Sequence, residues 1–233
     1  LVLFQRLDIF SAKAAAALAA LGVSDDPAER VPPASALVQP RQRIIVSTGH
    51  RIDAPERPQP RFPAEAEPAA RAAMAKAIEE ERSYADGPVK GIASLANGSD
   101  ILFHEVAAEL GLETEAVLAL PENQFLQRSV AGNGGTWSER FRKLCAKLSP
   151  DVLDEAMPAW VSAADRHYVF QRCNMWMLER AFATENADVT LIALWNGAAG
   201  DGPGGTADMV DLARERGAKI VVLNTGDLLT SAE

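Results

Sequence analysis

A glycine-rich segment at residues 202–206 has the composition of an anion-binding turn. It consists of Gly-Pro-Gly-Gly-Thr and follows an apolar stretch at 191–195, which predicts a buried strand, a tight turn and the start of a helix. Small residues let the backbone approach a ligand, and the N–H groups of a first helical turn point at an anion. Gly204, Gly205 and Thr206 are therefore candidate phosphate ligands, although the same glycines would also serve a plain turn.

Two further polar turns follow predicted strands at 43–47 and 89–95. The candidate ligand-binding residues in these turns are Thr48, Gly49, His50, Asn97, Gly98 and Asp100. His50 has no partner at metal-ligand spacing, so we expect it to form hydrogen bonds rather than bind a metal. Asp100 opens a predicted helix, where it either caps the helix or accepts hydrogen bonds from a ribose or a base.

A predicted helix ahead of the fourth strand carries one polar residue, Asn174, on an otherwise apolar face. The apolar residues of this inward face are Phe170, Cys173, Met177 and Ala181. A buried amide needs hydrogen-bond partners, so Asn174 either ties down a loop or reaches the ligand. Arg172 is a second candidate, but it lies roughly on the opposite side of an ideal helix. Both side chains can reach one crevice only if the helix is irregular.

The order of the predicted elements positions these turns. Predicted strands cover 43–47, 89–95, 114–120, 188–195 and 219–224. A helical insertion separates the third strand from the fourth, and capping-box spacings at Thr136/Glu139 and Ser162/Asp165 predict two helix starts within it. We therefore expect an α/β fold with a doubly wound, Rossmann-like parallel sheet of five strands in the order 3-2-1-4-5. The chain reverses direction between strands one and four, which brings the three turns to one crevice.

Composition predicts a cytoplasmic protein. The chain has 233 residues, a net charge of −9 and a pI of about 5.0, from which we expect no binding to a nucleic-acid backbone. Cys145 and Cys173 lack metal-ligand spacing and indicate reduced thiols. No apolar run reaches transmembrane length and no signal-peptide pattern opens the chain, so we expect no membrane association.

Residues 1–40 and 41–233 are expected to form separate parts. The first is alanine-rich and then interrupted by prolines, which predicts an accessory helix and a linker, compatible with a fused upstream domain. The second carries all the candidate site residues. No lysine follows the glycines at 202–205 and no GxGxxG motif follows the first strand, so neither the P-loop nor the dinucleotide fingerprint is present. We expect no metal and no cofactor.

Four motifs together resemble the SLOG superfamily. This superfamily groups the lonely-guy phosphoribohydrolases, the related lysine-decarboxylase-like proteins, the DNA-processing proteins and many bacterial nucleotide sensors. The motifs are residues 47–51, 93–100, 172–174 and 195–197 with 202–206, and the resemblance spans about 43–225. It implies a Rossmann-like domain that binds a nucleotide or a nucleotide-derived ligand, as the sensor-type members do.

The chain departs from the hydrolytic branch of that superfamily. The phosphoribohydrolases carry PGGxGTxxE, whose glutamate assists the sugar cation, whereas here the turn is one residue shorter and no glutamate stands at that place. The leading hypothesis is therefore a nucleotide-binding sensor domain with little or no turnover, expected to form a homo-oligomer. The alternative is a nucleotide N-glycosidase that uses Asp208 or Glu122. A third hypothesis is a structural domain with a vestigial pocket.

Overall fold

The computed structural model describes residues 40–153, 168–199 and 202–230. The chain divides into a unit of residues 1–39 and a unit of residues 40–233, and all described residues lie in the second. The predicted accessory helix, and the helix start predicted at Ser162, lie outside the described residues.

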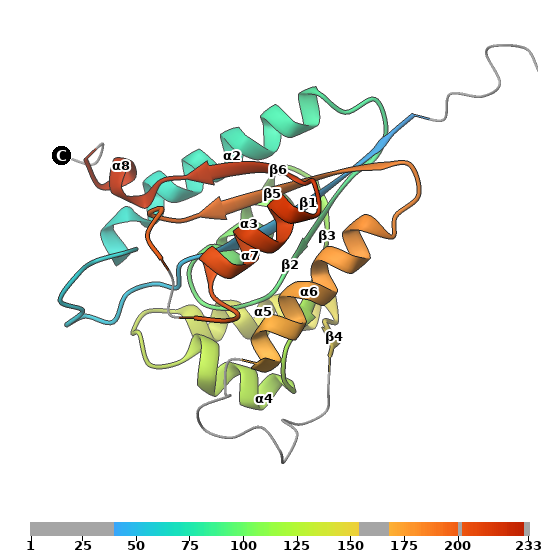
Figure 1. Cartoon of the computed structure of the whole chain (residues 1–233). Helices are drawn as coiled ribbons and strands as arrows, with labels where there is room; N and C mark the ends of the chain where they lie inside the picture. Colours follow the sequence, from blue (N-terminus) through green and yellow to red (C-terminus); the bar gives the residue numbers. More distant parts are fainter. Residues whose placement is uncertain (1–39, 154–167, 200–201, 231–233) are drawn as a thin grey trace, which may run out of the picture. The chain divides into compact units, whose positions relative to one another are not determined.

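A parallel sheet of six strands forms the centre of the Rossmann-like α/β fold (Figure 1). Its strands are β1 (Gln42–Gly49), β2 (Val89–Ala93), β3 (Glu113–Leu118), β4 (Asp151–Val152), β5 (Ala187–Leu194) and β6 (Lys219–Leu223), in the order β4-β3-β2-β1-β5-β6. β1 pairs with β2 on one side and with β5 on the other, where Gly49 aligns with Leu194. The chain thus reverses its winding direction between β1 and β5, as the sequence predicts.

The prediction of a five-stranded sheet is wrong by one strand. β4 has two residues, both exposed, and it extends β3 at the edge through the pairs Val117–Asp151 and Leu118–Val152. Two exposed residues have neither an apolar run nor an alternating pattern, so no sequence signal marked this strand. The other five strands keep the predicted order.

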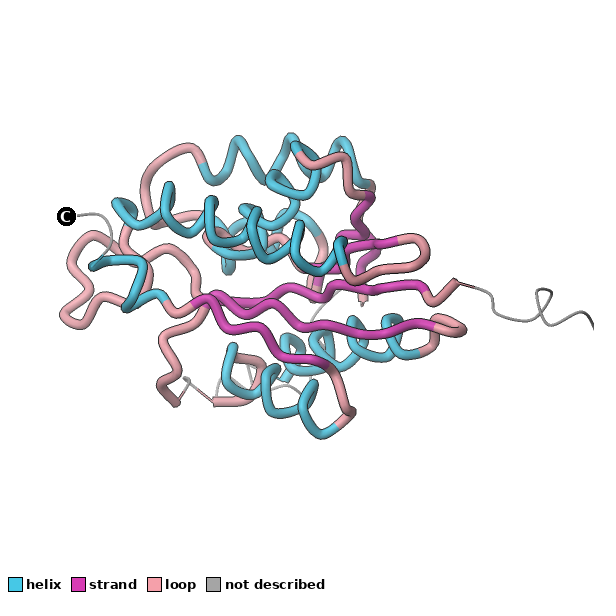
Figure 2. Tube along the Cα trace, turned by 90° about the horizontal axis from the view of Figure 1, so that it is seen from above, coloured by secondary structure: helices cyan, strands magenta, loops and turns pink. Residues whose placement is uncertain are grey.

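Helices cover both faces of the sheet (Figure 2). They are α2 (Glu67–Ser83), α3 (Ser99–Glu109), α4 (Glu122–Phe125), α5 (Trp137–Leu148), α6 (Tyr168–Phe182), α7 (Thr206–Glu215) and α8 (Thr225–Thr230), with the short turns η2 (Ala64–Ala66) and η3 (Leu126–Val130). α2 packs against α3, and α6 packs against α7. Right-handed crossovers place the first pair on one face and α7 on the other, because the chain winds in opposite directions from β1 and from β5.

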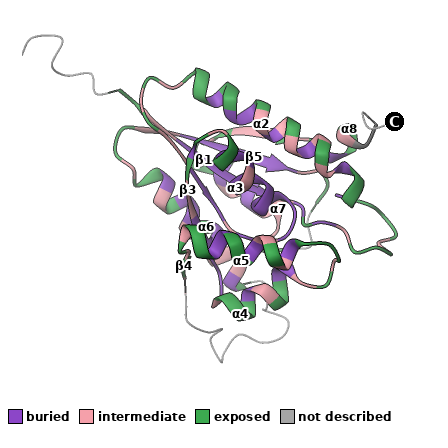
Figure 3. Cartoon of the chain, turned by 180° about the vertical axis from the view of Figure 1, so that it is seen from behind, coloured by how far each residue is buried: buried purple, intermediate pink, exposed green. Residues whose placement is uncertain are grey.

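The core is formed by apolar side chains at strand and helix spacing. On α2 the inward residues Ala70, Met74, Ala77 and Ile78 are all buried. Figure 3 shows buried residues along the strands and on the inward helix faces. α5 begins where it was predicted, with Thr136 as its N-cap, but the Thr136 side chain makes no capping bond. The capping-box chemistry is therefore absent, and Glu139 pairs with Lys143 instead.

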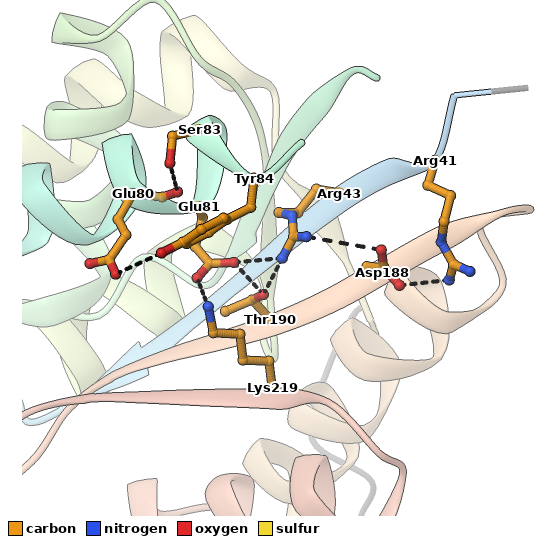
Figure 4. A network of polar contacts seen from close by, with 9 residues as sticks. All are labelled: Arg41, Arg43, Glu80, Glu81, Ser83, Tyr84, Asp188, Thr190 and Lys219. Carbon is orange, nitrogen blue, oxygen red and sulfur yellow. Dashed lines mark hydrogen bonds and ion pairs between the residues drawn. The ribbon is translucent and has the colours of Figure 1, made fainter. Parts of the chain in front are cut away.

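A network of charges closes the amino end of the sheet (Figure 4). Glu81, near the end of α2, is 1% exposed and accepts hydrogen bonds from Arg43 at 2.7 Å, Thr190 at 2.8 Å and Lys219 at 2.6 Å. Burial raises the pKa of Glu81, but the hydrogen bonds from Lys219, Thr190 and Arg43 outweigh it and hold the pKa below its ordinary value. Four secondary-structure elements, α2, β1, β5 and β6, are joined through this one carboxylate.

Candidate functional site

A cavity of about 590 Å³ lies at the opposite, carboxyl end of the central strands. The connections after β1, β2 and β5 line it, together with α6 and the segment between α4 and α5. Ligands of open α/β sheets bind at this edge, at the point where the winding reverses. Its volume lies within the usual range for small-molecule sites, roughly 300–1,000 Å³.

Eight of the candidate residues line this cavity. They are Thr48, Gly49, His50, Asp100, Asn174, Gly204, Gly205 and Thr206. Asn97, Gly98 and Arg172 are not among the residues that line it. The structure therefore brings together residues from three turns and from α6 that lie far apart in the sequence.

Asn97 and Gly98 contact residues that line the cavity. Asn97 is fully buried, accepts a hydrogen bond from Arg51 Nε at 3.0 Å and donates to the carbonyl of Val130 at 2.8 Å. Gly98 has a φ of +88°, and a Cβ there would lie 2.6 Å from the backbone nitrogen of Ile52. Only glycine fits this approach.

Asn174 ties down the glycine-rich turn. Its Nδ2 donates to the carbonyl of Gly204 at 3.3 Å, and the residue is 9% exposed. The sequence left two roles open for Asn174, tying down a loop or reaching a ligand, and this hydrogen bond corresponds to the first. Arg172 lies over the ring of Tyr168, at 5.9 Å from its centroid.

The amides of the glycine-rich turn are partly occupied. Gly204 N donates to Asp208 Oδ2 at 2.9 Å, and Gly205 N donates to the carbonyl of Gly202 at 3.2 Å. The backbone N–H groups of Thr206 and Ala207 meet no acceptor in the described part of the chain. Of the three predicted residues, only Thr206 therefore keeps an available amide, and the second available amide belongs to Ala207 in the first turn of α7.

The two candidate catalytic carboxylates do not line the cavity. Both oxygens of Asp208 have partners, because Oδ1 accepts from Gln171 Nε2 at 3.2 Å and Oδ2 from Gly204 N. Glu122 is exposed at the first residue of α4. Asp208 thus stabilises the start of α7, where a carboxylate also interacts favourably with the helix dipole.

Asp100 is a buried carboxyl group among the residues that line the cavity. The residue is 8% exposed, and its Oδ2 accepts a hydrogen bond from Ala96 N at 3.2 Å. Among the described residues, Oδ1 has no hydrogen-bond partner. Burial raises the pKa of Asp100 to about 7, and the bond from Ala96 and the charge of Arg51 oppose this only in part. Gly98, not Asp100, is the N-cap of α3.

His50 is held in place by the end of β5. Its Nε2 lies 2.9 Å from the side-chain oxygen of Asn196. Burial lowers the pKa of His50, the hydrogen bond to Asn196 raises it, and the charge of Arg61 lowers it further. The pKa lies below its ordinary value of 6.5, so the ring is neutral at pH 7.

Cys173 lines the cavity but is a poor nucleophile. Cys145 and Cys173 are both free and buried. Burial raises the pKa of each thiol to about 12, so neither forms a thiolate near pH 7.

Four arginines that the sequence analysis did not select line one part of the cavity. They are Arg51, Arg57, Arg61 and Arg128, and we call them the arginine cluster. Three of them lie in the proline-rich connection that follows β1. The signal in the sequence is three basic residues within eleven positions directly after the first strand.

Hydrogen bonds hold the loops of the arginine cluster together. Arg51 Nη1 donates to the carbonyl of Arg128 at 3.1 Å, and Asn133 Nδ2 donates to the carbonyl of Ile52. Asp53 accepts from the backbone nitrogens of Arg61 at 2.7 Å and Phe62 at 2.8 Å, which folds the loop back on itself. The carboxylate of Asp53 is thus engaged within the loop.

Within residues 40–153, 168–199 and 202–230, no group of three or more His, Cys, Asp or Glu side chains is placed to hold a metal ion. None of the helices in that part of the chain combines the length and apolar character needed to span a bilayer.

Neither the protein-family models nor the curated proteins contain a match to the sequence. Among solved structures, the chain is similar to DNA processing protein A of Streptococcus pneumoniae, with 17% identity and a TM-score of 0.38. The match covers 83% of this chain and 65% of the other, so the chain spans less than two thirds of that protein's length.

This match contradicts one prediction from composition. A net charge of −9 suggested that no nucleic acid is bound, but the matched protein is a DNA-processing protein, and the exclusion is withdrawn. Net charge sums over the whole chain, whereas recognition depends on local charge. Here the cavity is lined by four arginines against two aspartates although the chain as a whole is acidic.

Proposed function

We propose that the chain binds a nucleotide or a nucleotide-derived anion in this cavity and does not cleave it, as a sensor domain would. The observation that carries the proposal is the juxtaposition, in one cavity, of the arginine cluster, the first turn of α7 and the carboxyl of Asp100. Arginines and helix N-termini are the groups that proteins use for phosphate.

Charge favours an anion as the ligand. Arginines outnumber aspartates around the cavity, and Asp53 already accepts two backbone hydrogen bonds. Thr206 supplies a hydroxyl and an N–H group at the start of α7. Each charge-assisted hydrogen bond contributes about 1.5–3 kcal/mol, so one phosphate accounts for micromolar affinity only with several of them.

The remaining lining favours a nucleoside as the rest of the ligand. Phe170 and Trp195 line the cavity, are partly exposed and provide flat apolar surfaces for a base, whereas Phe125 is 1% exposed and stacks on Phe141. Asp100 Oδ1 is placed to accept a hydrogen bond from a sugar hydroxyl or an exocyclic amine.

The placement of the carboxylates favours binding over hydrolysis. Glycoside cleavage ordinarily needs two carboxyl groups that flank the bond. Asp208 and Glu122 do not line the cavity, and Asp53 is held by its own loop. Of the two carboxylates that line the cavity, Asp53 and Asp100, only Asp100 has an oxygen with no hydrogen bond or ion pair among the described residues.

The binding test is calorimetry with a panel of nucleoside mono- and diphosphates. Gly205 is the N-cap of α7 at a φ of −82°, so aspartate and serine fit its backbone, and both are good N-caps. Gly205→Asp places a negative charge beside the free amides and is expected to weaken binding at least about tenfold. Gly205→Ser is the matched neutral control: both side chains can cap the N–H of Ala207, so the further loss of affinity from the serine to the aspartate variant measures the charge. Equal affinity of the aspartate variant and the wild type would contradict the placement of the phosphate at the start of α7.

Turnover is tested separately. The protein is incubated with the same nucleotides and with NAD, and released base is sought by chromatography. We expect none. Release of base by the purified wild-type chain would replace the binding proposal with the N-glycosidase alternative.

A further inference from the structure

The outward face of α6 differs in composition from the outward faces of the other long helices. The inward face of α6 packs against β1, β2, β3 and β5, and the helix lies beside α7. The exposed residues of α6 are Tyr168, Met175, Glu179 and Phe182, and the three apolar ones have exposed fractions of 37–41%. None of the exposed residues of α2 and α5 is a large apolar one. A surface helix normally presents polar residues to solvent, so this face of α6 has the composition of a contact surface.

The apolar residues on this face form one stripe along the helix. Tyr168, Met175 and Phe182 follow one another at intervals of seven residues, about two helical turns, so they lie in one row. Arg172 and Glu179 each come four residues after a member of this row and therefore lie on the same side of the helix. We call these five residues the α6 stripe.

The α6 stripe is complementary to itself when it is turned around its midpoint at Met175. Tyr168 and Phe182 both lie about 10.5 Å from Met175 along the helix, on opposite sides of it. Arg172 and Glu179 lie about 4.5 Å and about 6 Å from the same point, also on opposite sides, and they carry opposite charges. Antiparallel packing of two copies therefore places aromatic against aromatic and cation against anion. Parallel packing would place each charge against a like charge.

Contacts within the chain leave the anion of the stripe accessible. Glu179 pairs with Arg216, the C-cap of α7, at 3.5 Å, and 58% of the Glu179 side chain remains exposed. A carboxylate has two oxygens and can accept from a second cation. Arg172 lies over the ring of Tyr168, at 5.9 Å from its centroid, so the cation and the aromatic ring of the stripe are held together. Charges at such a surface set orientation, whereas burial of the apolar row drives association.

From this self-complementary stripe we infer that α6 is the contact surface of a homodimer, in which two copies of the chain pack their α6 helices antiparallel. A two-fold interface uses the same patch on both subunits, so a stripe that matches its own reversed copy identifies a second copy as the occupant. Standard interfaces use roughly 20–30 residues a side, more than the α6 stripe provides, so the dimer is reversible and its fraction rises with protein concentration. The inference is independent of the proposed nucleotide binding, which uses the residues of α6 that line the cavity.

Sedimentation equilibrium of the full chain over a range of concentrations measures the association. The wild-type mass should rise from that of the 24.9 kDa chain towards twice this value. Met175→Glu places two carboxylates against each other at the two-fold axis and should raise the dissociation constant of the dimer at least about a hundredfold. Val222→Glu is the matched control, because Val222 is a similarly exposed apolar residue that lies on β6. Its dissociation constant should stay within about threefold of the wild type.

Exchange of the two charges tests the antiparallel orientation. Arg172→Glu and Glu179→Arg each replace two opposite-charge contacts by two like-charge contacts, because the two-fold axis repeats each contact. Each should raise the dissociation constant by about tenfold. The double variant Arg172→Glu/Glu179→Arg restores opposite charges across the interface and should return to within about threefold of the wild type. Thermal unfolding checks that every variant is folded, and the charge variants carry the test alone if Met175→Glu is not.

Three results would overturn the inference. A chain that stays monomeric at every concentration does not use α6 to bind a second copy. A dimer that Val222→Glu weakens and Met175→Glu does not is formed through another surface. A dimer that the single charge reversals weaken and the double variant does not restore lacks the antiparallel pairing of Arg172 with Glu179 of the partner subunit.

Discussion

Each end of the sheet contains a buried carboxyl group, and the two groups differ in their partners and in the direction of their pKa shift. At the amino end, Glu81 is 1% exposed and has Arg43, Lys219 and Thr190 as partners (Figure 4). At the carboxyl end, Asp100 is 8% exposed and has one backbone hydrogen bond. The pKa of Glu81 is lowered, whereas that of Asp100 is raised to about 7.

The comparison shows that burial alone does not determine the direction in which the pKa of a carboxyl group shifts. Both groups lose solvent, which raises the pKa of a carboxyl. At Glu81 the protein supplies the compensating charges itself, so the network joins elements and leaves nothing for a ligand. At Asp100 no ion pair forms within the described structure, one carboxyl oxygen has no hydrogen-bond partner there, and the residue lines a cavity. A buried titratable group that lines a cavity and has an atom without a hydrogen-bond partner is typical of a functional site.

Replacing Glu81 should have the largest effect on stability. Glu81→Gln leaves Arg43 and Lys219 beside a neutral group, and breaking a buried pair costs about 3–5 kcal/mol. Urea unfolding at pH 7 measures this, with the neighbouring exposed Glu80→Gln as a control expected within about 0.5 kcal/mol of the wild type. Because the pKa of Glu81 is lowered in the folded state, the stabilisation is present above its ordinary value of 4.5 and is lost as the pH falls further. A cost that does not shrink at low pH would contradict this account.

Asp100→Asn should act in the opposite direction. The folded-state pKa of Asp100 is raised from 3.8 to about 7, so wild-type stability falls as the pH rises through this range, by at most about 4 kcal/mol. Asparagine keeps an oxygen for Ala96 N and cannot ionise. We expect the variant to be more stable than the wild type at pH 8, with the difference shrinking towards pH 4. Unfolding curves at intervals between pH 4 and 8 test it, and a constant destabilisation at every pH would break the comparison.

Gly49→Ala tests whether the floor of the cavity is rigid. A Cβ at Gly49 would lie 2.5 Å from Ser99 Oγ and 2.6 Å from the carbonyl of Leu194. Overpacking against backbone of this kind costs about 1–3 kcal/mol. Ser47→Ala, two residues earlier on β1, is the matched control, because the Ser47 hydroxyl is buried without a partner in the described residues and its removal should be neutral or stabilising. If both variants unfold at the same urea concentration, the floor is not tightly packed.

Glu122→Gln should have the smallest effect. Glu122 is exposed and does not line the cavity, so nucleotide affinity should stay within about twofold of the wild type and stability within about 0.5 kcal/mol. Calorimetry and urea unfolding measure both. A large loss of nucleotide affinity would show that the binding site extends to α4. The comparison between the two ends of the sheet would then be weaker.

The sheet and its helices were predictable because their signals are local. The apolar run that forms β5 is buried from Val189 to Leu194, and the inward face of α2 follows helical spacing. Gly217 has a φ of +84° and lies two residues after the end of α7, where glycine commonly ends a helix. Strand order then followed from the handedness of crossovers. The two-residue β4 has no such signal.

The details of the site depended on partners that are distant in the sequence. Nothing local shows that the Asp208 carboxylate takes the N–H group of Gly204, or that Asn174 bonds to the carbonyl of that residue. The arginine cluster needs a contact between Arg51 and Arg128, which lie 77 positions apart. The sequence located the edge of the sheet where these groups meet, but not which of their hydrogen-bonding groups are still available.

The hydrogen bonds that join the loops of the arginine cluster have a consequence for the rate of ligand association. Because Asp53 folds one loop and Asn133 ties it to its neighbour, the charged side of the cavity is assembled before any ligand arrives. An encounter then requires no ordering of chain, and the association rate is governed by diffusion and electrostatic steering. Raising the ionic strength should slow arrival of the ligand much more than it changes the residence time.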